Sequence, residues 1–281
     1  MNESGCFKKG FRRSIGAVLK AVFPTRCLTC GSLYHENPAL EVNPQEKPLL
    51  YPDDDLGFAR EMAPFLCGDC SSRFVPIDSP LCTRCGMMFD SRQGEDHLCR
   101  GCAQHPKSLA RARSLGVYEG RFMNLIHAFK YSGKIQLARP LGRMLFQLFL
   151  SQWDWGEIDT VMPVPLHPRR LRDRGFNQSF LLVQRWPELS ESLGFAQKNI
   201  SVDCKTLFRH KWTRPQTGLN RNERMANIQK VFYVGDPLKV VDKRILVVDD
   251  VYTTGATMNE CARVLIQAGA DEVHGLTLAR A

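Results

Sequence analysis

The sequence of 281 residues has no long apolar run. No stretch approaches the roughly 18 consecutive apolar residues that a membrane-spanning helix requires, so no transmembrane segment is predicted. The apolar stretch near the start, Ile15 to Phe23, is interrupted by Lys20, and no cleavage site of small residues follows it. A secretory signal peptide is therefore not predicted either, and we expect a soluble protein of the cytoplasm.

Acidic residues are too few to balance the basic ones. The chain has 29 Asp and Glu against 38 Lys and Arg, which gives a net charge of +9. This surplus favours an anionic partner, and it leaves open whether that is nucleic acid, a phosphorylated metabolite or a membrane surface. The hydrophobic fraction of 43% is typical of a globular protein. The length exceeds what one compact domain usually needs, so we expect two domains.

Cysteine, in contrast, is abundant. Eight of the eleven cysteines form four C-x-x-C pairs, which are Cys27/Cys30, Cys67/Cys70, Cys82/Cys85 and Cys99/Cys102. Disulfide frameworks rarely repeat this spacing, whereas zinc knuckles do, because two intervening residues let both thiolates reach one tetrahedral ion. The pairs therefore favour zinc over disulfides and indicate a reducing compartment. The other cysteines, Cys6, Cys204 and Cys261, have no partner at ligand spacing and are expected to be plain thiols.

Two segments near the N-terminus are less informative. Residues 1–26 are predicted to contain a basic amphipathic helix, because apolar residues recur at helical spacing between lysines and arginines. We favour a helix docked on its neighbour, with a membrane or nucleic-acid contact as the alternative. Residues 31–66 carry five prolines and an acidic run, and we interpret them as a long irregular loop.

From residue 109 onward, predicted strands and helices alternate, which is typical of an α/β fold with a mostly parallel sheet. The predicted strands are Ser114–Tyr118, Ile158–Pro163, Ser201–Phe208, Lys230–Val234, Arg244–Asp249 and Glu272–Leu278. The predicted helices are Arg121–Tyr131, Ile135–Gln152, Gln178–Gly194, Gly218–Asn227 and Ala256–Ala268. The strand at 244–249 is apolar on both faces, as expected of a central strand that is covered on two sides.

The segment from Ile245 to Thr257 carries the clearest chemistry. Four apolar residues are followed by two acids, a turn of hydroxyl residues and glycine, and a predicted helix. The backbone N–H groups of the turn and of the helix start suit an anion, and Gly255 lets the backbone approach it. Asp249 and Asp250 would repel a phosphate, but they suit the vicinal hydroxyls of a sugar. A 5′-phosphorylated ribose satisfies both halves, with a Rossmann-like turn without a ligand as the alternative.

This segment resembles the phosphoribosyl pyrophosphate (PRPP) signature of type I phosphoribosyltransferases. Four other segments resemble the ComF family, namely Phe129–Gly133, Met162–Gln178, Arg214–Leu219 and Arg221–Asn227. The cysteine pairs resemble that family's N-terminal double zinc ribbon. The resemblance implies a type I phosphoribosyltransferase-like α/β domain in residues 109–281, with flanking helices, after a zinc-ribbon domain in residues 27–108. It also implies a link to DNA uptake in natural competence or to the use of DNA as a nutrient.

The resemblance further implies two structural zinc sites. Cys27 and Cys30 would join Cys67 and Cys70 at one ion, and the remaining two pairs would share the other, although an interleaved arrangement stays open. A PRPP-type ligand with Mg²⁺ would occupy the second domain. Its ribose hydroxyls would meet Asp249 and Asp250. Its 5′-phosphate would meet the turn, made of Thr253, Thr254, Gly255, Ala256 and Thr257.

Arginines complete the expected site. Arg169, Arg170 and Arg174 belong to a predicted loop, Arg169–Arg174, and would hold the pyrophosphate, with a solvated basic loop or a nucleic-acid contact as alternatives. Arg214 would act with the two aspartates from a mobile loop, Arg209–Arg224, that closes over the site, with a surface loop leading into an ordinary helix as the alternative. The last predicted strand ends near the end of the sequence, so an acceptor pocket is expected from residues 109–135 or from the zinc region.

Two functions compete at this point. The first is a phosphoribosyltransferase that transfers ribose 5-phosphate from PRPP with loss of pyrophosphate. The second is a non-catalytic adaptor that uses the zinc ribbons and basic loops to bind single-stranded DNA or a protein of the DNA-uptake machinery. The sequence leaves open whether catalysis occurs.

Overall fold

The computed structural model describes residues 25–35, 55–105, 107–154, 156–194, 200–213, 228 and 230–281. The predicted helix within residues 1–26, most of the long insert, the predicted helix Gly218–Asn227 and Arg214 lie outside these residues. Across the described ranges, every helix is too short or too polar to cross a bilayer.

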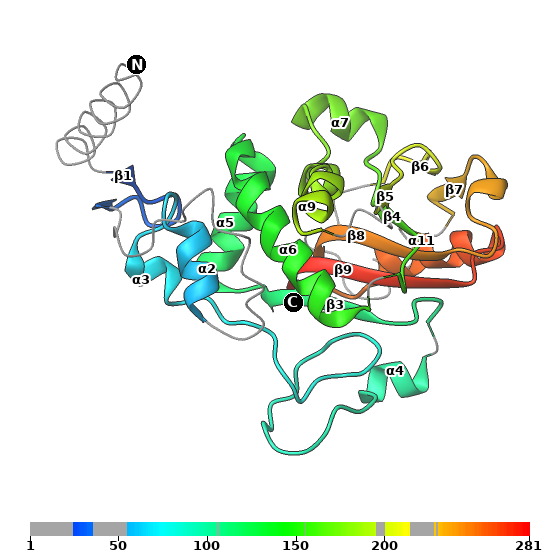
Figure 1. The fold of residues 1–281 in the computed structure, drawn as a ribbon, viewed down its shortest axis with the longest axis horizontal. Coiled ribbons are helices and arrows are strands. Elements are labelled where there is room, and N and C mark those ends of the chain that lie inside the picture. Colours follow the sequence, from blue (N-terminus) through cyan, green and yellow to red (C-terminus); the bar gives the residue numbers. More distant parts are fainter. Residues whose placement is uncertain are drawn as a thin grey trace, which may run out of the picture.

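A five-stranded sheet forms the centre of the α/β region from β3 onward (Figure 1), and all of its neighbouring strands are parallel. Its strands, in spatial order, are β3 (Ala112–Val117), β9 (Glu272–Arg280), β8 (Arg244–Tyr252), β4 (Thr160–Pro163) and β5 (Ser201–Val202). The expected α/β fold with a mostly parallel sheet is confirmed.

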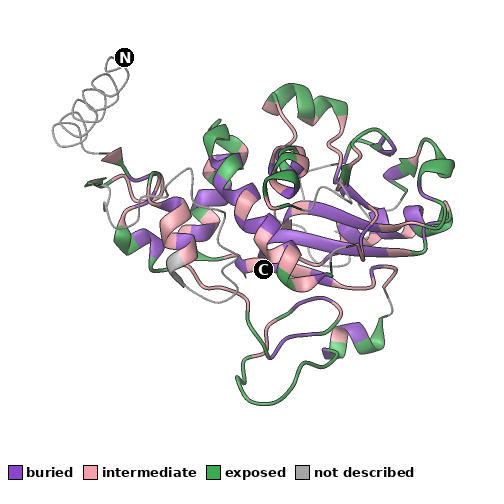
Figure 2. Ribbon diagram, viewed as in Figure 1, coloured by how far each residue is buried: buried purple, intermediate pink, exposed green. Residues whose placement is uncertain are grey.

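Central strand β8 is covered on both sides, because its successive side chains point to opposite faces. Leu246 and Val248 pack into one core, and Ile245 and Val247 pack into another. The first core includes α5 (Gly120–Tyr131), α6 (Ala138–Gln152), α8 (Gln178–Val183) and α9 (Trp186–Ser192). The second includes α11 (Ala256–Gln267) and the antiparallel pair β6 (Leu207–Arg209) and β7 (Phe232–Val234). Figure 2 shows the central strands almost wholly buried between these layers.

The predicted strand Ser201–Phe208 is wrong as a single element. It divides into β5, which joins the main sheet, and β6, which pairs with β7. Asp203 causes the break, because its carboxylate accepts hydrogen bonds from the backbone N–H groups of Lys205 and Thr206 at 2.7 and 3.1 Å. Side-chain bonds of this kind compete with a continuous strand ladder.

Three further predictions, two of helices and one of a loop, also change. The expected helix Gln178–Gly194 is divided between α8 and α9, and Pro187 lies in the first turn of α9. The stretch Arg169–Arg174, expected to be a loop, belongs to α7 (Pro168–Arg174). Proline at the start of α7 and Gly175 at its end, with a φ of 81°, supply ordinary helix start and stop signals. The predicted helix Ile135–Gln152 begins with a 3-10 turn, η2 (Ile135–Leu137), and a second such turn is η3 (Pro237–Lys239).

The cysteine-rich region covers the outer edge of β3, which is the first strand of the sheet in spatial order. Its described elements are β1 (Thr25–Arg26), β2 (Leu33–Tyr34), α2 (Asp55–Met62), α3 (Gly68–Ser71) and α4 (Arg100–Gln104). The backbone N–H groups of Ile77 and Ala112 donate to the carbonyls of Leu115 and Arg84, at 3.2 and 2.7 Å. This contact satisfies polar groups that an open sheet edge would expose.

Helix α2 lies within residues 31–66, so the prediction of an irregular loop is wrong there. Tertiary packing explains the helix: Phe58 stacks on Phe74 with ring centroids 3.9 Å apart, and it meets the edge of Phe122 from α5. Met62 is fully buried in the same core. These partners are distant in sequence, so local composition could not reveal them.

Candidate functional site

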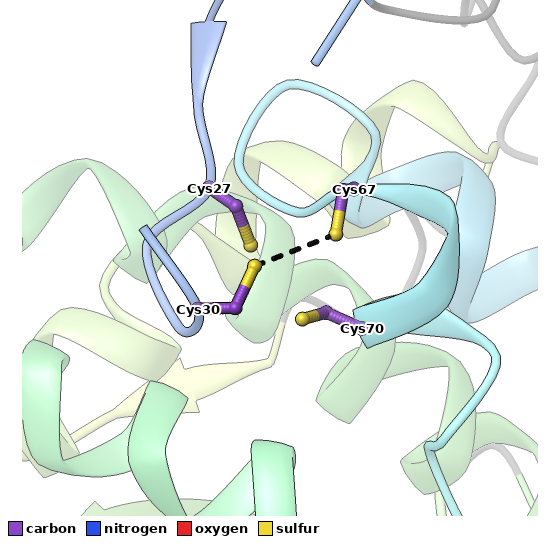
Figure 3. Close-up of side chains that lie close together, drawn as sticks. All are labelled: Cys27, Cys30, Cys67 and Cys70. Atoms are coloured by element: carbon purple, nitrogen blue, oxygen red, sulfur yellow. Dashed lines mark hydrogen bonds between the residues drawn. The ribbon is translucent and has the colours of Figure 1, made fainter. Parts of the chain in front are cut away.

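The eight cysteines of the C-x-x-C pairs form two groups of four, and the sulfurs of each group lie close together. The Sγ atoms of Cys27, Cys30, Cys67 and Cys70 lie within 4.8 Å of one another, and Figure 3 shows them pointing inward from the knuckle after β1 and from the start of α3. The other four, Cys82, Cys85, Cys99 and Cys102, form a second group of the same kind. The pairing implied by the family resemblance is therefore confirmed, and the interleaved arrangement is wrong.

Both groups fit zinc. Zn–S bonds of about 2.3 Å in a tetrahedron place sulfurs about 3.8 Å apart. The Cys30–Cys67 and Cys85–Cys99 sulfur distances are 3.7 and 3.8 Å. The backbone N–H groups of Cys85 and Cys99 point at the Cys82 sulfur at 3.4 and 3.3 Å, as in a metal knuckle. Four thiolates leave no open position, so an ion held here would be structural.

The thiols of each group differ in acidity. Burial opposes ionisation of Cys27 and Cys82, but backbone N–H donors lower their pKa to about 5 and about 6. Burial raises the pKa of Cys70 and Cys102 to about 12, with neighbouring thiols adding to the effect. A metal ion must displace those protons to be bound by four thiolates, so its affinity should rise with pH.

A cleft of about 760 Å³ opens where β8 and β4 end, beside α5, α7 and the turn before α11. Ligands of open parallel sheets bind at this edge. The predicted site residues that line it are Asp249, Asp250, Thr253, Gly255, Ala256, Thr257, Arg170 and Arg174. Thr254 and Arg169 do not line it, and Arg214 lies outside the described residues.

The two carboxylates at the end of β8 have different surroundings. Asp249 accepts hydrogen bonds from the Ser179 hydroxyl and from the backbone N–H of Asp250, both at 2.9 Å. Burial, and then the negative charge of Asp250, raise the pKa of Asp249 to about 7. Asp250 is 5% exposed, and its Oδ1 lies 2.7 Å from the Lys130 ammonium. Its buried Oδ2 has no hydrogen-bond partner within the described part of the chain.

Lys130 was not predicted as a site residue. It lies in the last turn of α5, and its side chain is 14% exposed. Burial acts to lower its pKa, but the Asp250 carboxylate outweighs that effect and raises it, so the ammonium stays charged. The only signal in the sequence was its place in Phe129–Gly133, one of the segments that resemble the ComF family.

The turn after β8 is shaped around Gly255. This residue has a φ of 76° and precedes the first turn of α11. A Cβ atom at this position would lie 2.2 Å from the Tyr252 hydroxyl, so any other residue would force Tyr252 or the turn to move. The Thr254 hydroxyl accepts from the N–H of Ala256 at 3.3 Å, which gives Thr254 a role in holding the turn. The start of α11 thus faces the cleft with the geometry of an anion site.

Three arginines give the opposite wall a positive charge. Arg170 donates to the Thr213 carbonyl at 3.1 Å, and Arg174 donates to the Gln178 side chain and lies over the Tyr131 ring. Arg209, on β6, was missed as a cleft residue because its segment was interpreted as part of a mobile loop. Burial and then Arg170 lower the pKa of Arg209 to about 10, which leaves it charged at neutral pH.

Arg169 has a different environment from its neighbours on α7. It is exposed, and its guanidinium lies 5.8 Å from the centroid of the Trp212 ring, outside the cleft. Figure 2 shows α7 largely exposed, as expected for a helix that presents only part of one side to the protein.

Comparisons with known proteins show which proteins this chain is similar to. Residues 187–281 match the family model of the phosphoribosyl transferase domain. The chain is 32% identical over 219 residues to DNA utilization protein YhgH of Escherichia coli (strain K12), covering 76% of this chain and 90% of that protein. It is 30% identical to competence protein F of Haemophilus influenzae over 77% of this chain and 90% of that protein. It is also 30% identical to competence protein ComFC of Streptococcus pneumoniae over 76% of this chain and 87% of that one.

A likeness to solved structures is weaker. Glutamine PRPP amidotransferase from B. subtilis is 21% identical over 50% of this chain and 26% of its own length, with a TM-score of 0.30. That likeness is too distant to bear on function.

Proposed function

Because the chain belongs to the ComF family of competence and DNA-utilisation proteins, we propose that its cleft binds PRPP together with Mg²⁺. The observation that carries this proposal is the buried, unpartnered Oδ2 of Asp250. An unpaired buried carboxylate oxygen is costly unless a ligand supplies its hydrogen bond. A ribose hydroxyl is a suitable donor. It would lie beside the anion site at the start of α11, because Asp250 lies near the end of β8, just before the turn that leads into this helix.

The cleft has separate places for the parts of PRPP. The 5′-phosphate would lie against the turn of Thr253 to Thr257, at the N-terminal end of α11. The ribose hydroxyls would meet Asp249 and Asp250. The pyrophosphate would face Arg170, Arg174 and Arg209, which line the same cleft. Guanidinium groups suit phosphate oxygens because their paired N–H donors match them.

Transfer of ribose 5-phosphate would break the bond between C1 of the ribose and pyrophosphate and form a bond from C1 to an acceptor. Bound Mg²⁺ would supply positive charge to the leaving pyrophosphate. The residues of the chain would act by position: Lys130 holds Asp250 Oδ1, which aims Oδ2 at the sugar. The arginines would stabilise the departing charge, and no covalent nucleophile is needed.

The acceptor would enter from α5. Tyr118, His127 and Tyr131 line the cleft on that side, and the His127 ring nitrogen lies 2.9 Å from the Tyr118 hydroxyl. The Arg174 guanidinium lies 5.0 Å from the centroid of the Tyr131 ring. These contacts favour residues 109–135 over the zinc region as the source of the acceptor pocket.

Calorimetric titration of the full-length, zinc-loaded protein with PRPP and Mg²⁺ tests the proposal. We expect saturable binding that is lost in the Asp249→Asn/Asp250→Asn variant and retained in Asp271→Asn, an exposed acid just before β9, at the opposite end of the sheet from the cleft. No binding to the folded wild-type protein would refute the proposed function.

A second candidate function is binding of single-stranded DNA, which a specific surface favours. Three aromatic residues near the β6–β7 pair, Phe208, Trp212 and Tyr233, are 38–46% exposed. Phe208 stacks on Tyr233 at 5.2 Å, and Arg169 covers Trp212. Exposed rings next to cations are the usual means of binding unpaired bases and their phosphates.

Fluorescence anisotropy with a labelled oligonucleotide tests this second function. The Trp212→Ala and Arg169→Ala variants should each weaken binding, and only the arginine change should reduce its salt dependence. Arg185→Ala, which removes an exposed arginine just before α9, is the matched control. Equal affinity of all four proteins would exclude this surface.

A further inference from the structure

We infer that the second four-cysteine site, Cys82/Cys85/Cys99/Cys102, positions the phosphate-binding turn through Arg280 and Tyr252. The two regions are far apart in sequence but are joined by consecutive contacts. The Arg280 guanidinium donates to the Cys85 sulfur at 3.4 Å, and the same group lies 4.7 Å from the centroid of the Tyr252 ring. Tyr252 in turn lies directly against Gly255, the residue that shapes the turn.

Tyr252 is held from two sides. It is 2% exposed. The Lys107 ammonium donates to its hydroxyl at 3.1 Å, whereas Arg280 lies over its ring. Both cations are linked to the second cysteine site. Arg280 contacts the Cys85 sulfur, and Lys107 follows Cys102 by five residues in the chain. The neighbouring N–H of Ser108 donates to the Asn259 side chain of α11 at 2.9 Å, which fastens the same segment to the helix that begins at the turn.

The surroundings of Arg280 give this contact its importance. Its Nε and Nη1 atoms are buried without a hydrogen-bond partner among the described residues, so the sulfur is the acceptor that the structure assigns to the guanidinium. A buried cation needs a compensating negative charge. Four thiolates around one divalent ion keep a net negative charge, which makes the metal-loaded site a suitable counter-charge for Arg280 and Lys107.

The first cysteine site has different neighbours. Cys27 and Cys70 belong to the hydrophobic core of the opposite sheet face, with α5 and α6. The second site shares its core with Tyr252, Met258 and the inner side of α11. The two sites therefore differ in what they support: the first packs on the helices, and the second packs behind the turn.

Hydrogen–deuterium exchange of the peptide that spans residues 252–258, measured on the full-length zinc-loaded protein without ligand, tests this inference. Cys85→Ser and Cys30→Ser each remove one ligand, one from each site, and form a matched pair. We expect exchange in this peptide to be about tenfold faster in Cys85→Ser, within the usual range of coupling between two sites, and unchanged in Cys30→Ser. Equal effects of the two variants, or no effect of Cys85→Ser, would overturn the inference.

If Cys85→Ser does not fold, Arg280→Ala tests the same inference. This variant keeps all eight cysteine ligands, so it should still bind two zinc ions per chain, which zinc analysis can measure. It should show the same faster exchange with full zinc content, and Arg73→Ala, which alters an exposed arginine near the first site, should not. Affinity for PRPP with Mg²⁺ should fall about tenfold in Arg280→Ala. That second measurement rests on the proposed function: if the wild type binds no PRPP, the proposed function fails, and the exchange result still decides the inference. Unchanged exchange in Arg280→Ala would refute it.

Discussion

Replacing Lys130 with methionine should destabilise the protein strongly, because it leaves Asp250 buried without its counter-charge. The ammonium and the carboxylate are 2.7 Å apart, with side chains only 14% and 7% exposed. Removing one partner of a buried ion pair costs about 3–5 kcal/mol. At about 2–3 °C per kcal/mol for a chain of this size, the melting temperature should fall by about 6–15 °C.

Thermal unfolding at pH 7 measures this change, and two further variants show its cause. Lys205→Met, at an exposed lysine, should leave the melting temperature nearly unchanged. The double variant Lys130→Met/Asp250→Asn should recover most of the loss, because it removes both charges and leaves none buried alone. A loss below about 1 kcal/mol in Lys130→Met, or a double variant no more stable than the single one, would refute the account of this pair.

Three further predictions follow from the same structure. Gly255→Ala should reduce affinity for PRPP at least about tenfold while the protein stays folded. The new Cβ would lie 2.2 Å from the Tyr252 hydroxyl and would strain the turn at a φ of 76°. Calorimetry measures the affinity and circular dichroism the fold, and wild-type affinity would contradict the prediction. The pKa of Asp249 is raised to about 7 from an ordinary value of about 3.9, so the native protein holds this proton more tightly than the unfolded chain does. The free energy of unfolding should therefore fall as pH rises from about 4 to 7. Affinity for PRPP should increase through pH 7 as the carboxylate ionises. A pH titration of both quantities that is the same for wild type and Asp249→Asn would exclude this assignment. Zinc analysis of the purified protein should give two ions per chain, one fewer in a Cys82→Ser variant, and retention of both ions by that variant would contradict the four-thiolate site.

The central part of the site was predictable because it is local in sequence. The four apolar residues, two acids, turn and helix of Ile245 to Thr257 follow one another, and each piece has its own signal. The structure places them as strand β8, the turn and α11. The C-x-x-C spacing is local in the same way, whereas the grouping of the pairs came from the family resemblance.

The rest of the site depends on tertiary contacts that no local pattern carries. Lys130 is 120 positions from Asp250 and reaches it only because α5 packs on the sheet beside the end of β8. Arg209 enters the cleft because Asp203 ends β5 early and the chain turns into a second small sheet. Arg280 and Cys85 meet only once the cysteine region is packed against the edge strand β3.

The most direct test of the account is a crystal structure of the full-length protein with PRPP and Mg²⁺. We predict the 5′-phosphate against the turn of Thr253 to Thr257 at the start of α11, a ribose hydroxyl within hydrogen-bond distance of Asp250 Oδ2, and the pyrophosphate against Arg170, Arg174 and Arg209. A ligand bound away from this cleft, or one whose ribose leaves Asp250 Oδ2 without a partner, would contradict the central claim.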